Sequence, residues 1–574
     1  MNYRMEKDII NFLEENIDKN KDYSNLIERP KISEHGDFSL PVFVFSKELK
    51  KNPIDIAKEF EEKLNKSLPN LISKIQAVGP YLNIYLNNSI IVEQILKDIE
   101  KGKLLKYEVD NKQKVLVEWP SPNTNKSLHI GHVRNILIGK TLCNLLEKSG
   151  NEVIKTNLNN DRGIAICKAM LAYKLYGENK TPESEGIKPD KFVESYYVLF
   201  GEKVKENPHL DDEALKMLED WENGDEDTIN LWRKLMSWVY YGYKETYKKF
   251  GIKHEKTYYE SEIYDKGKNI VLKALKDNVE GFKQEEDGAI LCDFENEKFG
   301  KKYLLRGNGT TLYMTQDLYL ADQKNKDFGA DKFVYITGQE QKYHFEVLFE
   351  LLKRIGFGDY EKYYHFAYGY VYDKDGKKFS SRKGKIIRAD ELYQEIYNKA
   401  KDNIKSKGFV KNSDKDLENK SKIISYAAMA FYILKFNTNS DMNFDIDASV
   451  SFEGETGPYV QYTYARISSL LQKGNFEIKK NINYSIFEDK ENLLIKELRL
   501  FPEIIQDALN KYKLSAIPNY LIKISQMYNE IYQNYNVLKA DEEIKNARLY
   551  LAYITSKVIK EGLSYLDIQT IENM

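Results

Sequence analysis

The fold is decided by the stretch KVLVEWPSPNTNKSLHIGH, residues 114–132. Its first part, Val115–Glu118, is a mostly apolar, β-branched run typical of a short buried strand, and a turn rich in Pro, Ser and Asn follows. Apolar residues at helical spacing then predict a helix from about His132 to Ser149, and a second strand begins at Val153. Units of strand, helix and strand build parallel, doubly wound sheets.

The length of 574 residues exceeds one ordinary hydrophobic core, and about 150 residues per domain suggests three or four domains. We expect residues 1–110 to form a small α+β N-terminal domain. Residues 111–390 predict an α/β, Rossmann-type nucleotide-binding catalytic domain, with a polar helical insertion at about 173–256. Residues 391–574 have helical spacing with few strand signals, and they predict an all-α C-terminal bundle.

Local patterns predict further elements in the two outer domains. Near the N-terminus, helices are expected around Met5–Ile17 and Ile54–Leu68. A strand-like run through Ile84 follows and is expected to end before Lys101. In the last third, Leu493–Tyr512 has helical spacing.

The composition is that of a globular protein, with 42% hydrophobic and 31% charged residues. No apolar stretch approaches the ~20 residues of a membrane-spanning helix, and the N-terminus is charged, so we expect a cytoplasmic protein without membrane contact. The three cysteines form no CxxC pair, which favours neither a disulfide framework nor a zinc site. The net charge of −2 does not indicate nucleic-acid binding, although a local basic face can coexist with an acidic remainder.

Two histidines stand where the polar loop enters the predicted helix, and we call residues 119–132 the histidine loop. His129 and His132 flank Gly131. Free N–H groups and the positive end of a helix attract phosphate, and the glycine lets an adenine or ribose approach the backbone. The imidazoles can donate to phosphate oxygens as charge builds in a transition state. A metal site is disfavoured because no acidic partner stands at ligand spacing.

A second cationic segment, Lys377–Lys385, combines lysines, an arginine, small hydroxyls and glycine, and we call it the lysine loop. Such a loop can close over a triphosphate and stabilise the charge that develops there. A solvated basic turn is the alternative interpretation.

The two loops resemble the signatures of one enzyme class. His129-Ile130-Gly131-His132 matches the HIGH signature of class I aminoacyl-tRNA synthetases, and Lys378–Arg382, about 250 residues later, is similar to their KMSKS signature in its arginyl variant. Arg382 stands where the general class has a second lysine. In arginyl enzymes without that lysine, a lysine just before HIGH is thought to compensate, and Lys126 stands there.

Further segments resemble the arginyl family in particular. They are Glu118–Asn123 (E-x-S-S-P-N), Tyr313–Asp317 (Y-x-T-x-D), Gly338–Phe345 (G-x-E-Q-x-x-H-F), Gly454–Tyr462 (G-D-T-G-P-Y-x-Q-Y) and, in the family's N-terminal tRNA-contacting domain, His35–Asp37 and Val78–Tyr81. The similarity spans nearly the whole chain and implies a helical anticodon-binding domain after residue 390.

The resemblance implies a set of site residues. The catalytic residues are expected to be Lys126, His129, His132, Lys378 and Arg382. ATP is expected to contact His129, Gly131, His132, Lys378, Ser380 and Ser381. Arginine is expected to contact Glu118, Ser121, Asn123, His129, Tyr313, Asp317 and Gln341.

The chemistry of arginine fits this set. A permanently charged, planar guanidinium requires a carboxylate that accepts a bidentate pair, and both Asp317 and Glu118 are candidates. Asn123 and Gln341 are polar groups suited to the α-amino and α-carboxylate ends. Citrulline or lysine would leave polar groups of such a site without hydrogen-bond partners, and the site would therefore reject both.

The resemblance implies ATP-dependent attachment of L-arginine to tRNA(Arg) through an arginyl-adenylate, with Mg²⁺ accompanying ATP. It also implies that arginine activation requires bound tRNA, and we expect a monomer. Two alternatives stay open: another class I synthetase or nucleotidyltransferase, and a non-catalytic tRNA-binding paralogue.

Overall fold

The computed structural model describes residues 2–28, 30, 35–295, 298–377, 387–408, 413–479 and 482–574, with side chains from residue 7 onward. The chain divides into two compact units: Met1–Lys106 with Thr463–Glu503 and Lys523–Glu561, and Tyr107–Tyr462 with Ile504–Ile522 and Gly562–Met574. Within the described ranges, no helix has both the length and the apolarity to cross a membrane.

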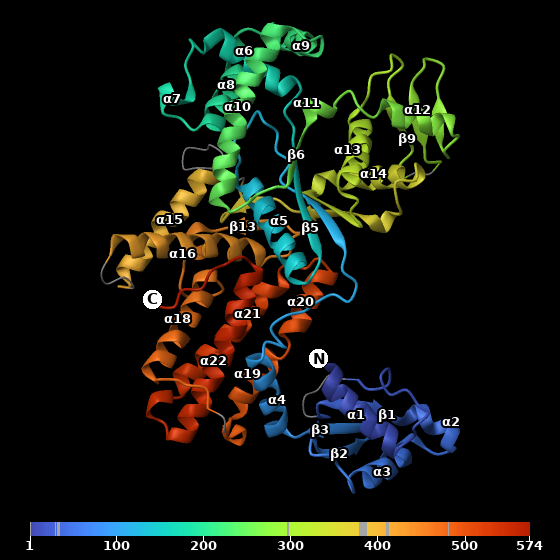
Figure 1. The fold of residues 1–574 in the computed structure, drawn as a ribbon, viewed down its shortest axis with the longest axis vertical. Helices are drawn as coiled ribbons and strands as arrows, with labels where there is room; N and C mark the ends of the chain where they lie inside the picture. The colour runs from blue at the N-terminus through green and yellow to red at the C-terminus, as the bar shows by residue number, and fades with distance from the viewer. Residues whose placement is uncertain are drawn as a thin grey trace. The chain divides into compact units, whose positions relative to one another are not determined.

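The second unit is built on a five-stranded sheet (Figure 1). Its strands are β4 (Lys114–Glu118), β5 (Glu152–Asn159), β6 (Lys256–Tyr259), β10 (Lys332–Gly338) and β11 (Tyr363–Tyr368). They lie in the order β11-β10-β4-β5-β6, and every neighbouring pair is parallel. The strand order reverses between β4 and β10, and ligands of such sheets bind at the carboxyl edge there. The predicted α/β, Rossmann-type fold is confirmed.

Both faces of the central strands are covered. Leu116 of β4 packs in one core with Phe333 and Tyr335 of β10, together with α12 (Lys268–Lys276), α13 (Tyr313–Phe328), α14 (Lys342–Arg354) and a small antiparallel sheet. That sheet comprises β7 (Phe282–Gln284), β8 (Ile290–Asp293) and β9 (Lys301–Leu305). Helix α5 (Ile130–Lys148) lies beside β4, β5 and β10 (Figure 1). Strands covered on both faces are continuously apolar, which is why residues 115–117 do not alternate.

The stretch between β5 and β6 is helical, as its sequence predicts. It contains α6 (Ile164–Tyr176), α7 (Pro182–Glu185), α8 (Pro189–Glu206), α9 (Leu210–Glu222) and α10 (Glu226–Lys249), followed after β6 by α11 (Glu260–Ile263). Helices α6, α8 and α10 pack on one another. Most polar side chains of this stretch lie on exposed helix faces, but Asp190 of α8 and Thr228 and Thr246 of α10 are buried.

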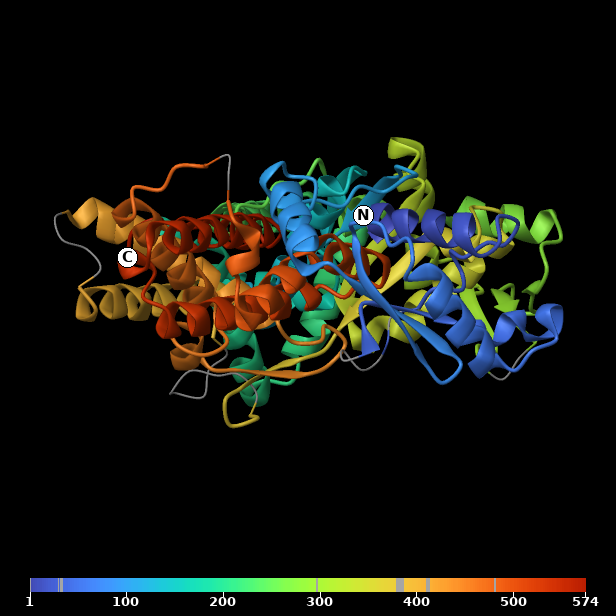
Figure 2. The same ribbon diagram turned by 90° about the horizontal axis from the view of Figure 1, so that it is seen from below.

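The N-terminal part of the first unit contains a three-stranded antiparallel sheet, whose strands are the blue arrows of Figure 2. It comprises β1 (Phe38–Pro41), β2 (Ile72–Val78) and β3 (Tyr81–Leu86), accompanied by α1 (Asn2–Asn16), η2 (Val42–Phe45), α2 (Ser46–Leu49), α3 (Pro53–Leu64) and α4 (Asn88–Glu100). The predicted strand-like run towards Lys101 is wrong after Leu86, where α4 begins. Ile91, Ile95 and Ile99 of α4 are buried at intervals of four residues, which is a helical period.

The last third is predominantly helical, as predicted. Its elements are α15 (Ala389–Ser406), α16 (Asp414–Leu434), α17 (Ile446–Ser449), α18 (Gly457–Lys473), α19 (Asp489–Leu498), α20 (Phe501–Asn510), α21 (Ala516–Asn534) and α22 (Glu542–Tyr565). The stretch Leu493–Tyr512 forms two helices because Pro502 lacks a backbone N–H and suits the first turn of a new helix. A short parallel pair, β12 (Val371–Asp373) with β13 (Met442–Phe444), accompanies these helices.

Candidate active site

The two histidines of the histidine loop cap the start of α5. Nδ1 of His129 accepts the backbone N–H of Gly131 at 3.1 Å, and Nδ1 of His132 accepts the backbone N–H of His129 at 3.1 Å. The ring centroids are 4.1 Å apart. Because each Nδ1 is an acceptor, the proton of each neutral ring lies on Nε2. Each imidazole is thereby a donor on the side opposite its capping bond.

The charge state of His132 is set by its surroundings. Burial, followed by the neighbouring His129 and Lys126, holds the pKa of His132 well below its usual 6.5. The ring is neutral at pH 7 and contributes an oriented N–H. Positive potential for phosphate comes from the N-terminus of α5 and from the Lys126 ammonium.

Gly131 makes room for the first histidine. A Cβ at this position would lie 2.9 Å from Cε1 and 3.1 Å from Nδ1 of His129. Any larger residue would displace the ring that accepts the Gly131 N–H. The glycine is thus required by the capping geometry itself, in addition to the ligand approach expected from the sequence.

The polar turn before the histidines is fastened from two sides. The backbone N–H of Thr124 donates to the carbonyl of Asn160, just beyond β5, at 3.0 Å. From α10, the hydroxyl of Tyr243 lies 2.6 Å from the carbonyl oxygen of Lys126 and 3.0 Å from that of Asn123. The side chains of Asn123 and Lys126 are exposed. The turn therefore holds two predicted ligand residues at its ends.

Four lysine-loop residues predicted for the site lie outside the described residues: Lys378, Ser380 and Ser381, which are predicted to bind ATP, and Arg382, which is predicted to be catalytic together with Lys378. The chain that follows them returns to the histidine loop. The backbone N–H of Ala389 donates to the carbonyl of Leu128 at 2.7 Å, and Arg388 forms an isolated bridge with His129. The chain after the lysine loop is thus attached to the histidine loop by backbone bonds.

A buried arginine in α5 holds the strand that precedes the lysine loop. The guanidinium of Arg134 donates to five backbone carbonyls at 2.7–3.3 Å, those of Gly369, Tyr370, Asn437, Thr438 and Ser440. Burial lowers the pKa of Arg134 to about 10, so the group stays charged at neutral pH. Arg134 could not be singled out from the sequence, because a lone arginine on a helix usually faces solvent.

Asp317 lies on α13 and belongs, with Glu118, to the part of the candidate site that we call the carboxylate end. Its Oδ2 is 2.6 Å from Nε2 of His344 on α14, and both side chains are 30% exposed. Burial lowers the pKa of His344, but the hydrogen bond to Asp317 raises it, and the net shift is upward. Gln341 ends η3 (Gln339–Gln341), which follows β10 directly. Asp317 thus combines a fixed position with an accessible carboxylate.

Glu118, the last residue of β4, is paired internally. Its carboxylate forms an ion pair with Nζ of Lys324, and the side chains are only 7% and 1% exposed. The ammonium also lies 4.7 Å from the ring centroid of Tyr335. After burial, the charges of Glu118 and, more weakly, Asp317 raise the pKa of Tyr335. The structure supplies Lys324 as the partner of Glu118, which the sequence did not indicate.

Glu260 is a further carboxyl at this end that the sequence interpretation missed. It follows β6 directly and is 9% exposed. Burial raises its pKa from 4.5 to about 7; Arg162 opposes the shift, and Asp161 and Asp317 add to it. Its place immediately after a strand was the available signal, because ligands bind at the carboxyl edge of such sheets.

The remaining predicted arginine ligands occupy different environments. The hydroxyl of Ser121 accepts the backbone N–H of Leu158 at 3.4 Å and so ties the histidine loop to β5. Tyr313 begins α13 and is 72% exposed. Ser121 is thus engaged in the scaffold, whereas Tyr313 is open to solvent.

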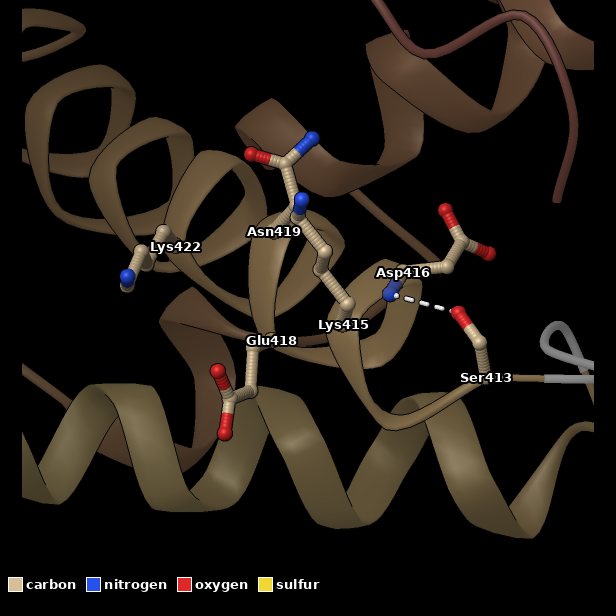
Figure 3. Close-up of a pocket in the computed structure, with 6 residues that line it drawn as sticks. All are labelled: Ser413, Lys415, Asp416, Glu418, Asn419 and Lys422. Carbon is tan, nitrogen blue, oxygen red and sulfur yellow. Dashed lines mark hydrogen bonds between the residues drawn. The ribbon is translucent and has the colours of Figure 1, made fainter.

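A separate surface cavity lies at the start of α16 (Figure 3). It is lined by Ser413, Lys415, Asp416, Glu418, Asn419 and Lys422. The backbone N–H of Asp416 donates to the Ser413 hydroxyl at 3.1 Å, an ordinary helix cap. The other side chains point in different directions, and none of the predicted site residues takes part.

A parallel sheet of this strand order, with a HIGH-type loop at its switch point, is typical of class I aminoacyl-tRNA synthetases. The family model described as tRNA synthetases class I (R), catalytic domain, matches residues 92–446. The Arginyl tRNA synthetase N terminal domain matches residues 4–86, and the DALR anticodon binding domain matches residues 460–574. The chain belongs to the arginyl-tRNA synthetase family.

Curated relatives and solved structures agree with this assignment. The chain is 38% identical to the arginine–tRNA ligase of Treponema denticola, covering 96% of this chain and 94% of the relative. It is 35% identical to that of Parabacteroides distasonis, covering 96% and 95%. The arginyl-tRNA synthetase of Thermus thermophilus has the same fold, with a TM-score of 0.78, 23% identity and 99% of each chain covered. That of Plasmodium falciparum has a TM-score of 0.73, 22% identity and the same coverage.

Proposed function

We infer that this chain is an arginine–tRNA ligase, which uses ATP to attach arginine to tRNA. The inference rests on two features that occur together in a chain of this family. They are the oriented imidazole donors of His129 and His132, and the accessible carboxylate of Asp317 beside His344. The first feature suits phosphate and the second suits a guanidinium.

In the first step, a carboxylate oxygen of arginine attacks the α-phosphorus of ATP. The bond from that phosphorus to the bridging oxygen breaks, and pyrophosphate leaves. Our assignment gives the phosphates to the Nε2–H groups of His129 and His132, with Gly131 beside the nucleotide. Catalysis then rests on positioning and on preorganised donors.

The charge that develops on pyrophosphate is assigned to cations. These cations are Lys126 of the histidine loop and Lys378 and Arg382 of the lysine loop. Ser380 and Ser381 of the lysine loop are assigned as further ATP contacts. Among the described residues, no three potential metal-binding side chains cluster together. We propose that Mg²⁺ enters with ATP, bound mainly by phosphate oxygens and water.

The guanidinium is assigned to the carboxylate end of the candidate site. Asp317, oriented by His344, is the principal acceptor in this proposal because its carboxylate is accessible, whereas Glu118 is already paired with Lys324. Glu260 adds a second acceptor. Asn123 and Gln341 serve the α-amino and α-carboxylate ends, and Ser121 and Tyr313 complete the surroundings.

In the second step, the terminal ribose hydroxyl of tRNA attacks the arginyl carbonyl carbon, and AMP leaves. We propose that the acceptor is tRNA(Arg) and that a monomer carries out both steps. In this proposal residues 1–110 contact the tRNA, residues 111–390 catalyse, and residues 391–574 bind the anticodon.

The test is amino-acid-dependent exchange of labelled pyrophosphate into ATP, with and without tRNA. We expect exchange with arginine and tRNA, and charging of tRNA(Arg) with arginine. Exchange with a different amino acid alone would favour another class I synthetase, and tRNA binding without any exchange would favour a non-catalytic paralogue.

The carboxylate assignment is tested with Asp317→Asn. Removal of the charge should raise the KM for arginine by about 100-fold to 1000-fold, since a partly buried ion pair to substrate is lost. The KM for ATP should change little. A wild-type KM for arginine would remove Asp317 from the guanidinium site.

A further inference from the structure

The turn from Asn123 to Lys126 is closed by a single side chain of the helical insertion. Within the turn, the backbone N–H of Lys126 donates to the carbonyl of Asn123 at 3.3 Å. The hydroxyl of Tyr243 then lies within hydrogen-bond distance of the carbonyls at both ends, 2.6 Å from Lys126 O and 3.0 Å from Asn123 O. One phenol therefore bridges the first and last residues of the turn.

The position of this phenol is itself fixed. Tyr243 is 1% exposed in the C-terminal half of α10, and its ring centroid is 6.2 Å from that of Tyr247. Burial raises the pKa of Tyr243 well above 10, so the hydroxyl stays protonated and remains a donor. Neighbouring contacts reinforce the attachment, since the Thr124 hydroxyl lies 3.2 Å from Sδ of Met236, also in α10.

The side chains of Asn123 and Lys126 are exposed, so packing against the described part of the chain does not fix them. The ammonium of Lys126 has one distant contact, 5.9 Å from the ring centroid of Tyr197 on α8. Their placement therefore depends on the backbone of the turn. A shift of about 1 Å in a group that contacts reacting atoms can lower a rate about 100-fold.

We propose that Tyr243 is a positioning residue for the activation step, which holds Asn123 and Lys126 in register with the bound arginine and ATP through the backbone of their shared turn. This assigns a role in catalysis to the helical insertion, which carries none of the predicted ligands. The inference rests on the roles proposed above for Asn123 and Lys126.

The experiment compares Tyr243→Phe with Tyr247→Phe in the full-length chain with tRNA. Both changes delete one buried hydroxyl from α10, but that of Tyr247 has no hydrogen-bond partner in the described part of the chain. We expect Tyr247→Phe to keep wild-type exchange. Tyr243→Phe should lower kcat for arginine-dependent exchange roughly tenfold and raise the KM for pyrophosphate, because the loss of one buried hydrogen bond is worth about a factor of ten. Replacement of Tyr243 by 4-aminophenylalanine, which keeps a donor at this place, should restore most of the rate.

A double-mutant cycle separates positioning from general destabilisation. If Tyr243 acts through Lys126, the pair Tyr243→Phe and Lys126→Ala should lose little more activity than Lys126→Ala alone. Fully additive losses, or a Tyr243→Phe enzyme as active as Tyr247→Phe, would overturn the inference. Failure of the proposed function is distinguishable, because the wild-type chain would then lack arginine-dependent exchange altogether.

Discussion

Two parts of the candidate site, the histidine end around His129 and His132 and the carboxylate end around Glu118 and Asp317, are built in opposite ways. At the histidine end, the imidazoles that we assign to phosphate are held by hydrogen bonds to backbone, and the His132 ring is neutral. At the carboxylate end, side-chain charges face one another: Glu118 with Lys324 and Asp317 with His344. A triphosphate arrives with its own metal ion and needs oriented donors, whereas a guanidinium carries a permanent charge that only carboxylates can balance.

The difference also concerns distance along the chain. The histidine end is completed within residues 123–132 and is supported from α10. The carboxylate end collects residues from β4, α11, α13 and α14, which meet only in the folded sheet. We therefore expect substitutions at the carboxylate end to affect stability and pH dependence, and those at the histidine end to affect turnover.

The largest effect is expected from Lys324→Met. This change leaves the Glu118 carboxylate buried without its partner, which should lower the free energy of unfolding by about 3–5 kcal/mol. Urea denaturation of the unliganded protein measures it. In the double variant with Glu118→Gln, which removes both charges, most of the stability should return. If the single and double variants lost the same free energy of unfolding, the unpaired charge of Glu118 would not be the cause of the loss.

At the histidine end, His132→Asn should separate capping from catalysis. The Asn side-chain oxygen can still accept the N–H of His129, so the fold should be nearly unchanged, but the Nε2 donor is lost. Loss of one preorganised donor typically lowers kcat about 100-fold to 1000-fold, and we expect the lower figure. Single-turnover adenylate formation measures the change. Full activity in this variant would reduce His132 to a helix cap.

The smallest effect is a pH dependence from Glu260. Its folded-state pKa of about 7 lies above its ordinary 4.5, so the carboxyl is protonated at pH 6 and ionised at pH 8. A positively charged ligand favours the ionised form, so the KM for arginine should fall roughly tenfold from pH 6 to pH 8. Over the same window the unliganded protein should lose stability, because the native state binds more protons than the unfolded state. In Glu260→Gln this part of the pH profile should be flat, and an unchanged profile would remove Glu260 from the guanidinium site.

Much of the fold could be predicted because its signals are local. The apolar strand before Glu118, the helix after His132 and the polar helices before β6 each follow from spacing over ten to twenty residues or so. The error after Leu86 arose where a short apolar run suits both strand and helix. The break at Pro502 follows from the chemistry of a single residue.

The sequence by itself determined the class of protein, because His129, Gly131 and His132 make their decisive contacts with one another within one helical turn. Only the tertiary structure decided that Lys324 neutralises Glu118, that Tyr243 closes the turn beside Lys126, and that His344 pairs with Asp317. The physical reason is that burial and pairing depend on distances in space. A lysine on an amphipathic helix has the same local pattern whether its ammonium faces water or a carboxylate.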